Sequence, residues 1–135
     1  MPRRAKPDAL SLAVGARIRQ LREELGITME RLAYESEVGS KGHLSNIERG
    51  LVRPTAHTLK ALADRLGVQL ADLVSFPGDG DRARLLDLTR RMTAPRVRLL
   101  LQEAEGMAAR APALRAAERT EKYRRARRPA PKGEG

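Results

Sequence analysis

The chain has 135 residues, a net charge of +10 and no cysteine. The absence of cysteine excludes disulfides, thiolate zinc sites and thiol nucleophiles, and no apolar run is long enough to cross a membrane. Hydrophobic residues make up 41% of the chain and aromatic residues only 2%. The core must therefore consist of Leu, Ile, Val, Ala and Met, which favour packed helices over strands, so we predict an all-α protein.

The excess of positive charge predicts a polyanionic partner, most often nucleic acid, with solubility alone as the other interpretation. The two histidines, His43 and His57, are too few to indicate a metal cluster, and we expect neither a metal nor a cofactor. The first residues are basic but lack a sustained apolar segment, so no secretory signal is expected. The predicted location is the cytoplasm, at the nucleoid.

A polar arm at residues 1–9, expected to be disordered, precedes the first helical pattern. In that pattern Val14, Ile18 and Leu21 share one face, and Arg17 is expected elsewhere around the helix. Gly26 stops the first helix, and polar residues suited to N-capping stand before the next three. Five helices are expected in the first part of the chain: about 10–24, 29–36, 41–48, 56–66 and 69–75.

Residues 77–80 are rich in Gly and Pro and predict a linker after a domain at 10–76. Residues 81–111 follow as two amphipathic helices, about 81–92 and from 93 onward, which we interpret as a helical hairpin. Pro112 is expected to interrupt the second helix. Residues 112–135 form a basic tail, helical at about 113–128 and then disordered.

The segment at residues 25–76 carries an ordered set of short motifs. They are Leu-Gly-Ile-Thr at 25–28, Leu-Ala at 32–33, Leu-Ser-Asn-Ile-Glu-Arg-Gly at 44–50, Pro at 54, and Leu-Ala and Leu-Gly-Val at 62–63 and 66–68. With these motifs the segment resembles the XRE, or phage-repressor-like, family of bacterial helix-turn-helix regulators. The resemblance implies a five-helix lambda-repressor-like domain that binds double-stranded DNA, in a protein that works as a dimer.

The segment departs from the usual family pattern at two places. Leu32 and Leu44 are twelve residues apart where the family usually has eleven, so the turn holds one extra residue around Glu37 to Gly39. Met29 stands where the family often has a glutamine that contacts the DNA backbone, and methionine cannot make that hydrogen bond.

The resemblance makes residues 41–48 the recognition helix, which fits the major groove of B-DNA. If Leu44 and Ile47 face inward, the polar residues of this helix remain outside. By family position the expected base contacts are Lys41, His43 and Asn46, with Ser45 and Ser40 as further candidates. The expected phosphate contacts are Thr28, Arg49 and Arg53. The alternatives are a solvated polar face and, for Thr28, a plain N-cap.

Two charged residues have a structural role in the resemblance. Family members pair the arginine at the position of Arg22 with the glutamate at the position of Glu48. We therefore expect a partly buried salt bridge that fixes the recognition helix against the first helix. No catalytic triad, phosphate-binding glycine loop or metal-ligand spacing stands out, and we do not expect an enzyme.

Residues 81–111 have apolar faces that must be covered, and we expect a homodimer interface there. The alternatives are a hairpin folded back on its own domain, or a site for a ligand or protein. The tail at 115–135 has eight basic residues against three acidic ones. It could add sequence-independent DNA affinity, bind RNA or an acidic protein, or serve solubility.

The function that these features favour is a sequence-specific transcriptional regulator, expected to be a repressor. An alternative from another class is an antitoxin whose C-terminal segment binds a toxin partner. A third is a general nucleoid or RNA-binding protein that uses charge alone.

Overall fold

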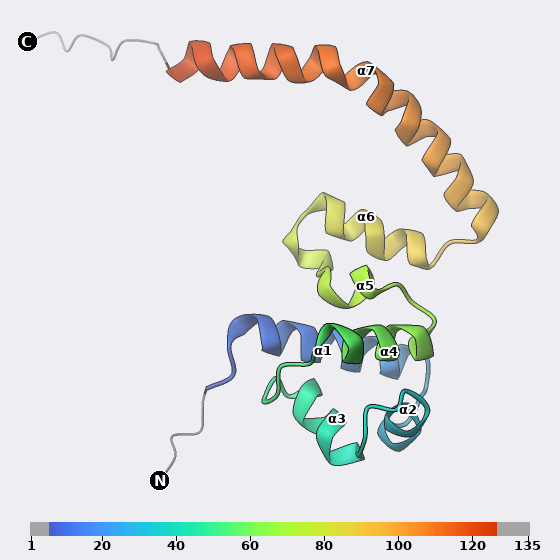
Figure 1. The fold of residues 1–135 in the computed structure, drawn as a ribbon. Helices are drawn as coiled ribbons and strands as arrows, with labels where there is room; N and C mark the ends of the chain where they lie inside the picture. Colours follow the sequence, from blue (N-terminus) through green and yellow to red (C-terminus); the bar gives the residue numbers. More distant parts are fainter. Residues whose placement is uncertain (1–5, 127–135) are drawn as a thin grey trace, which may run out of the picture. The chain divides into compact units, whose positions relative to one another are not determined.

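The computed structural model describes residues 6–126, and all regular structure within that range is helical (Figure 1). The elements are α1 (Ala9–Glu24), α2 (Met29–Glu35), α3 (Lys41–Glu48), α4 (Ala56–Leu66), α5 (Leu70–Val74), the 3-10 turn η1 (Pro77–Asp79), α6 (Asp81–Arg90) and α7 (Ala94–Ala126). The all-α prediction is confirmed. Parts of two predicted disordered segments, residues 1–5 and 127–135, lie outside the described residues. The chain divides into two units, one ending at Arg91 and the other beginning at Met92.

Four helices begin at a residue whose side chain caps the helix. Asp8, Thr28, Ser40 and Thr55 each accept a hydrogen bond from the backbone N–H three residues further along, at 2.9 to 3.2 Å. Such a cap satisfies one of the N–H groups that have no partner within the helix and stabilises it by about 1 kcal/mol. These caps set the first residues of α1, α2, α3 and α4.

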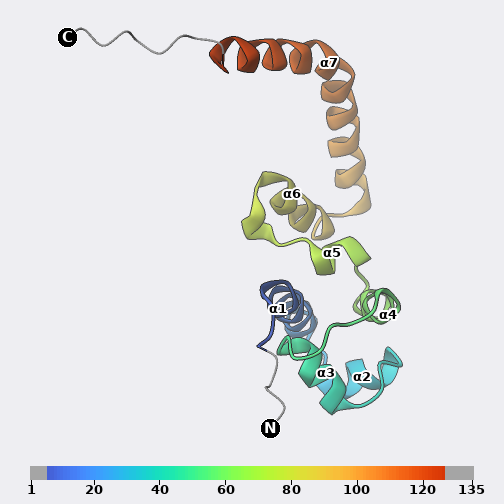
Figure 2. The same ribbon diagram turned by 60° about the vertical axis from the view of Figure 1, so that its left-hand side comes forward.

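The first unit has a purely aliphatic core. α1 packs against α3, α4 and α5, and α2 packs against α3 and α4. Figures 1 and 2 show α2 and α3 on one side of α1, with α5 on the other. The buried apolar residues are Val14, Ile18, Leu21, Leu32, Ala33, Leu44, Ile47, Leu62, Ala63, Leu66 and Leu73. They come from all five helices, as the helical spacing of apolar residues predicts.

Two glycines let the backbones of α1 and α3 come close together. A Cβ atom on Gly15 would lie 2.4 Å from the carbonyl oxygen of Ile47 and 2.6 Å from that of Glu48. Gly50, which has φ of +71°, would place a Cβ atom 2.9 Å from the Cα of Leu12. No larger residue fits at either position without moving backbone, so α3 is held directly against α1.

The turn between α2 and α3 absorbs its extra residue through two left-handed conformations. Glu37 has φ of 56° and Gly39 has φ of 111°. The left-handed region is unfavourable for a residue with a Cβ atom, which makes Glu37 a locally strained position. Because the turn takes up the insertion, Leu32 and Leu44 are both fully buried and α3 begins at Lys41, as predicted.

The prediction for Arg17 was wrong, because its side chain is buried rather than turned to solvent. Arg17 is 3% exposed, and its Nε donates to the carbonyl oxygen of Asp72 at 2.9 Å. Its Nη2 donates to Oδ1 of Asp87 at 2.8 Å. The aliphatic stem of an arginine can pack in a core while its charged head finds partners, and Arg17 uses that property to join α1, α5 and α6.

The same ionic contacts place α6 in the first unit. Arg90 of α6 donates to Glu24 of α1 at 2.7 Å, and Arg17 of α1 donates to Asp87 of α6 at 2.8 Å, so two ion pairs tie α6 to α1. The residues expected to form a linker, 77–80, contain the 3-10 turn η1 instead. The boundary between the units lies at Arg91 and Met92, so the segment 81–111, expected as one lobe, is divided between them.

Within residues 92–126, the regular structure of the second unit consists of α7. The expected interruption at Pro112 does not occur, and α7 continues through it to Ala126. A proline removes one N–H donor and crowds the preceding turn. These effects can bend a helix without ending it. α7 changes direction along its length in both views (Figures 1 and 2). Most of its described side chains are exposed.

Candidate nucleic-acid interface

α3 separates an apolar side from a polar side. Leu44 and Ile47 are at most 1% exposed and anchor the helix in the core. The residues predicted to contact bases all have access to solvent. Ser40, Lys41 and His43 are exposed, and Ser45 and Asn46 are half-buried. The structure thus brings all five predicted base contacts together on α3 and its cap.

The structure also forms the expected ion pair between Arg22 and Glu48. Nε of Arg22 lies 2.7 Å from Oε1 of Glu48, and Nη2 lies 3.1 Å from Oε2. The side chains are 12% and 3% exposed. The hydrogen bond to Glu48 raises the pKa of the Arg22 guanidinium, which therefore stays charged. Arg22 also donates to the carbonyl of Ile27 at 3.0 Å, so one side chain ties α1 to both α3 and the loop before α2.

Three side chains on the polar side of α3 already have partners within the chain: those of Lys41, Asn46 and Arg49. Lys41 pairs with Glu30 of α2, and this hydrogen bond lowers the pKa of the Glu30 carboxyl. Arg49 donates from Nη2 to Oδ1 of Asn46 at 2.8 Å. These contacts are exposed, so a ligand that approaches α3 can replace them.

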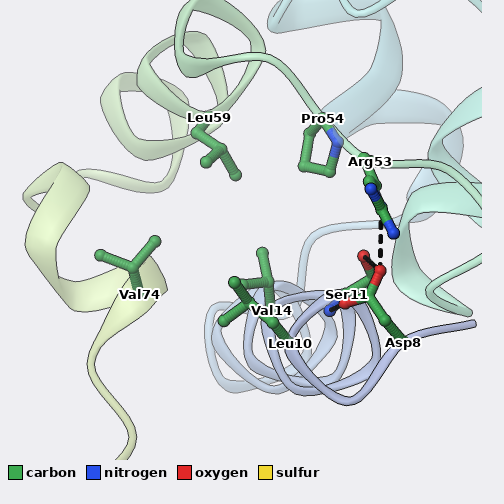
Figure 3. Close-up of a pocket in the computed structure, with 8 residues that line it drawn as sticks. All are labelled: Asp8, Leu10, Ser11, Val14, Arg53, Pro54, Leu59 and Val74. Atoms are coloured by element: carbon green, nitrogen blue, oxygen red, sulfur yellow. Dashed lines mark hydrogen bonds and ion pairs between the residues drawn. The ribbon is translucent and has the colours of Figure 1, made fainter.

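Arg53, a predicted phosphate contact, is held by an exposed carboxylate. Its Nε donates to Oδ2 of Asp8 at 2.9 Å, while Oδ1 of Asp8 caps α1 through the N–H of Ser11 (Figure 3). Hydrogen bonds from the backbone and side chain of Ser11, then from Arg53, lower the pKa of Asp8. Behind the pair lies a hollow of about 480 Å³. Its apolar lining residues are Leu10, Val14, Pro54, Leu59 and Val74.

Thr28 and Met29 stand at the start of α2. Thr28 is exposed, and its hydroxyl accepts a hydrogen bond from the N–H of Arg31 at 3.2 Å. Met29 is half-buried and packs against the core of the first unit. The side chain at the position of the family's glutamine therefore contributes to packing in this chain.

The contacts of Arg17 with Asp87 were missed in the sequence. The available signal was the position of Arg17, three residues after Val14 and four before Leu21. That spacing places Arg17 on the apolar face of α1. A cation on such a face needs a buried partner. Nothing in the sequence near α6 identifies Asp87 as that partner, because the two residues are 70 positions apart.

Comparisons with known proteins match the first unit of the chain. A family described as "Helix-turn-helix domain" matches residues 13–76. An HTH-type transcriptional regulator of Deinococcus deserti is 38% identical over 66 residues, covering 47% of this chain and 50% of that protein. An immunity repressor of Bacillus phage phi105 is 36% identical over 63 residues, covering 47% and 43%. An uncharacterized HTH-type transcriptional regulator of Sinorhizobium fredii is 42% identical over 62 residues, covering 46% and 79%.

The chain belongs to the XRE-like family of helix-turn-helix DNA-binding transcriptional regulators. The solved complex of the SinR and SinI proteins has the same fold, with a TM-score of 0.51 and 25% identity over 71% of this chain and 98% of that one. The chain spans only about half the length of the first two relatives. Within residues 6–126, no helix is long and apolar enough to span a bilayer, and no cluster of three potential metal ligands occurs.

Proposed function

We propose that the protein is a sequence-specific transcriptional repressor that inserts α3 into the major groove of double-stranded DNA. The observation that carries this proposal is the position of α3. Its polar side faces solvent, while Gly15 and the Arg22–Glu48 pair fix its other side against α1. A rigidly held helix with solvent-accessible polar side chains is the element that reads base edges in helix-turn-helix proteins.

Each predicted residue has a chemical role in this proposal. Lys41 donates to guanine, Asn46 bonds bidentately to adenine, and His43 donates or accepts, with Ser45 and Ser40 as further base contacts. The phosphate contacts Thr28, Arg49 and Arg53 set the orientation of the domain and carry no base preference. The free protein pairs Lys41, Arg49 and Arg53 internally, so DNA binding exchanges these contacts for base and phosphate contacts.

The name of one relative supports the repressor role. One relative is an immunity repressor, and the others are transcriptional regulators. These names favour a regulator over the antitoxin alternative. A repressor of this kind would act at the nucleoid in the cytoplasm.

The proposal includes a homodimer that uses residues from the segment 81–111. Large apolar side chains are exposed there: Leu85 and Leu88 on α6, and Leu99, Leu101 and Met107 on α7. A two-fold dimer would place two copies of α3 about 34–36 Å apart, one turn of B-DNA. Sedimentation of the wild type and of Leu101→Glu tests this, since a dimer that uses this surface becomes a monomer in the variant.

The test of sequence reading is selection of bound duplexes from a random library. We expect the wild type to enrich one motif and Asn46→Ala to lose preference at a single position, with discrimination falling by about 1–3 kcal/mol there. The control is Thr58→Ala, a substitution on α4 at a residue with no predicted DNA contact. Failure of the wild type to enrich any motif would contradict sequence-specific binding.

A further inference from the structure

The C-terminal half of α7 carries a cluster of positive charge that the helix-turn-helix unit does not use. Residues 108–126 contain six cations and only two carboxylates. The cations are Arg110, Arg115, Arg119, Lys122, Arg124 and Arg125, and the carboxylates are Glu118 and Glu121. This excess of positive charge predicts that this part of the helix binds an anionic partner.

Three of these cations share one face of the helix. Arg115, Arg119 and Lys122 follow one another at spacings of four and three, which places them above one another on an α-helix. All three are exposed, and none has an ion pair among the residues that the structure describes. Glu118 lies on the same side, three residues after Arg115 and four before Lys122, so this side keeps a net charge of +2. Arg125 differs, since its Nε lies 3.7 Å from a carboxylate oxygen of Glu121. We call the three residues the α7 basic face.

Two arginines of the α7 basic face border a hollow of about 540 Å³ on the helix surface. The other lining residues described are Ala108, Pro112 and Ala116. Short side chains give this hollow a low floor and no bulky apolar anchor of the kind that dominates protein–protein interfaces. A sugar–phosphate chain needs no such anchor, and it can approach the floor while its phosphates meet the guanidinium groups.

We infer that the α7 basic face binds the phosphate backbone of the double-stranded DNA to which α3 also binds. This inference rests on the proposed function, which supplies the DNA bound by α3. What it adds is a second contact with the DNA, made by α7 and independent of base sequence. Arg115 and Lys122 lie about 10 Å apart along the helix axis at 1.5 Å per residue. That length spans roughly three phosphates of one strand, which follow at 3.4 Å per base pair. The three cations stand about 6 and 4.5 Å apart along that axis, each interval longer than one 3.4 Å step, so each cation can meet a different phosphate.

The experiment compares two triple variants of the full chain that lose the same charge. In the first, Arg115, Arg119 and Lys122 are each replaced by Gln. In the second, the matched control, three exposed cations outside this face and outside residues 81–111 are replaced by Gln: Arg19, Lys60 and Arg124. Glutamine is a good helix former, and circular dichroism verifies that both variants keep their helices. The probes are a duplex selected by the wild type and a scrambled duplex of the same composition. Each is titrated at salt concentrations from about 50 to about 300 mM, over which the Debye length shortens from more than about 10 Å to less than about 8 Å.

We expect the first variant to bind both duplexes at least about tenfold more weakly and to lower the salt slope by about three, or about one for each lost phosphate contact. The ratio of affinities for the two duplexes stays unchanged. Equal salt slopes for the two variants would overturn the inference, because they would show only the effect of net charge. A structured RNA hairpin is titrated as a third probe, and a loss of binding confined to the hairpin would also overturn the inference. If the wild type binds both duplexes equally, the proposed function fails, and the difference in slope between the variants still decides this inference.

Discussion

Replacing Glu48 with Gln removes one charge from a pair that is almost completely shielded from water. Arg22 and Glu48 make two hydrogen bonds, at 2.7 and 3.1 Å, and their side chains are 12% and 3% exposed. Losing one partner of a buried pair destabilises a protein by about 3–5 kcal/mol, since the remaining charge is left without compensation. Glutamine keeps one acceptor oxygen and nearly the same volume. We therefore expect a destabilisation near the lower end of that range, about 3 kcal/mol.

Thermal unfolding followed by circular dichroism measures this effect. For a domain of about 90 residues, 1 kcal/mol corresponds to about 4–8 °C in Tm, so Glu48→Gln should lower Tm by about 12–24 °C. The control is Glu23→Gln, which breaks an exposed pair with Arg19 and should leave Tm unchanged. An apolar double variant, Arg22→Met with Glu48→Leu, should recover most of the loss, because neither charge remains buried. An unchanged Tm for Glu48→Gln would refute a structural role for the pair.

Three further perturbations test other parts of the first unit. Burial raises the pKa of the Asp87 carboxyl, but hydrogen bonds from Arg17 and Arg90 outweigh burial and hold this pKa below its ordinary value of 3.8. The ionised carboxylate therefore stabilises the folded protein above that pH, and this stabilisation is lost as the pH falls. The difference in unfolding free energy between wild type and Asp87→Asn should thus be constant above about pH 5 and shrink below about pH 4. Asp8→Asn keeps an N-cap but releases Arg53, so DNA affinity measured by fluorescence anisotropy should rise roughly threefold at low salt, with no rise if Arg53 does not meet DNA. Gly15→Ala should lower the free energy of unfolding, measured by denaturant titration, by at least about 3 kcal/mol. Gly106→Ala is the control and should not destabilise the protein, because a Cβ atom at Gly106 would meet nothing within 4 Å. Similar values for the two variants would contradict the close approach of α1 and α3.

The sequence predicts the first unit well because its signals are local. Capping residues such as Ser40 and Thr55 act on the helix that follows them, and apolar residues at helical spacing define each buried face. The extra residue between α2 and α3 was visible in the sequence, but the backbone conformation that accommodates it was not. The left-handed conformation of Glu37 depends on the positions of Leu32 and Leu44 in the assembled core.

The place of α6 could not be predicted for a physical reason. The spacing of apolar side chains predicts which face of a helix is buried. In α6, however, only Asp87 is buried, and ion pairs hold the helix in place. A charged residue on a polar helix resembles any solvated residue until its partner is known. The continuation of α7 through Pro112 is likewise a balance between one lost hydrogen bond and the helical preference of its many Ala, Leu, Glu and Arg neighbours.

Ion pairs serve two separate purposes in this chain, and their exposure distinguishes them. Arg22 with Glu48 is shielded from salt, so it sets structure at any ionic strength. Lys41 with Glu30 is exposed, and DNA that engages Lys41 must first displace the carboxylate. The net gain from each such exchange is smaller than the gain from a cation without a partner. If α3 and the α7 basic face both meet DNA, α7 therefore supplies more affinity per charge, and α3 supplies the discrimination between sequences.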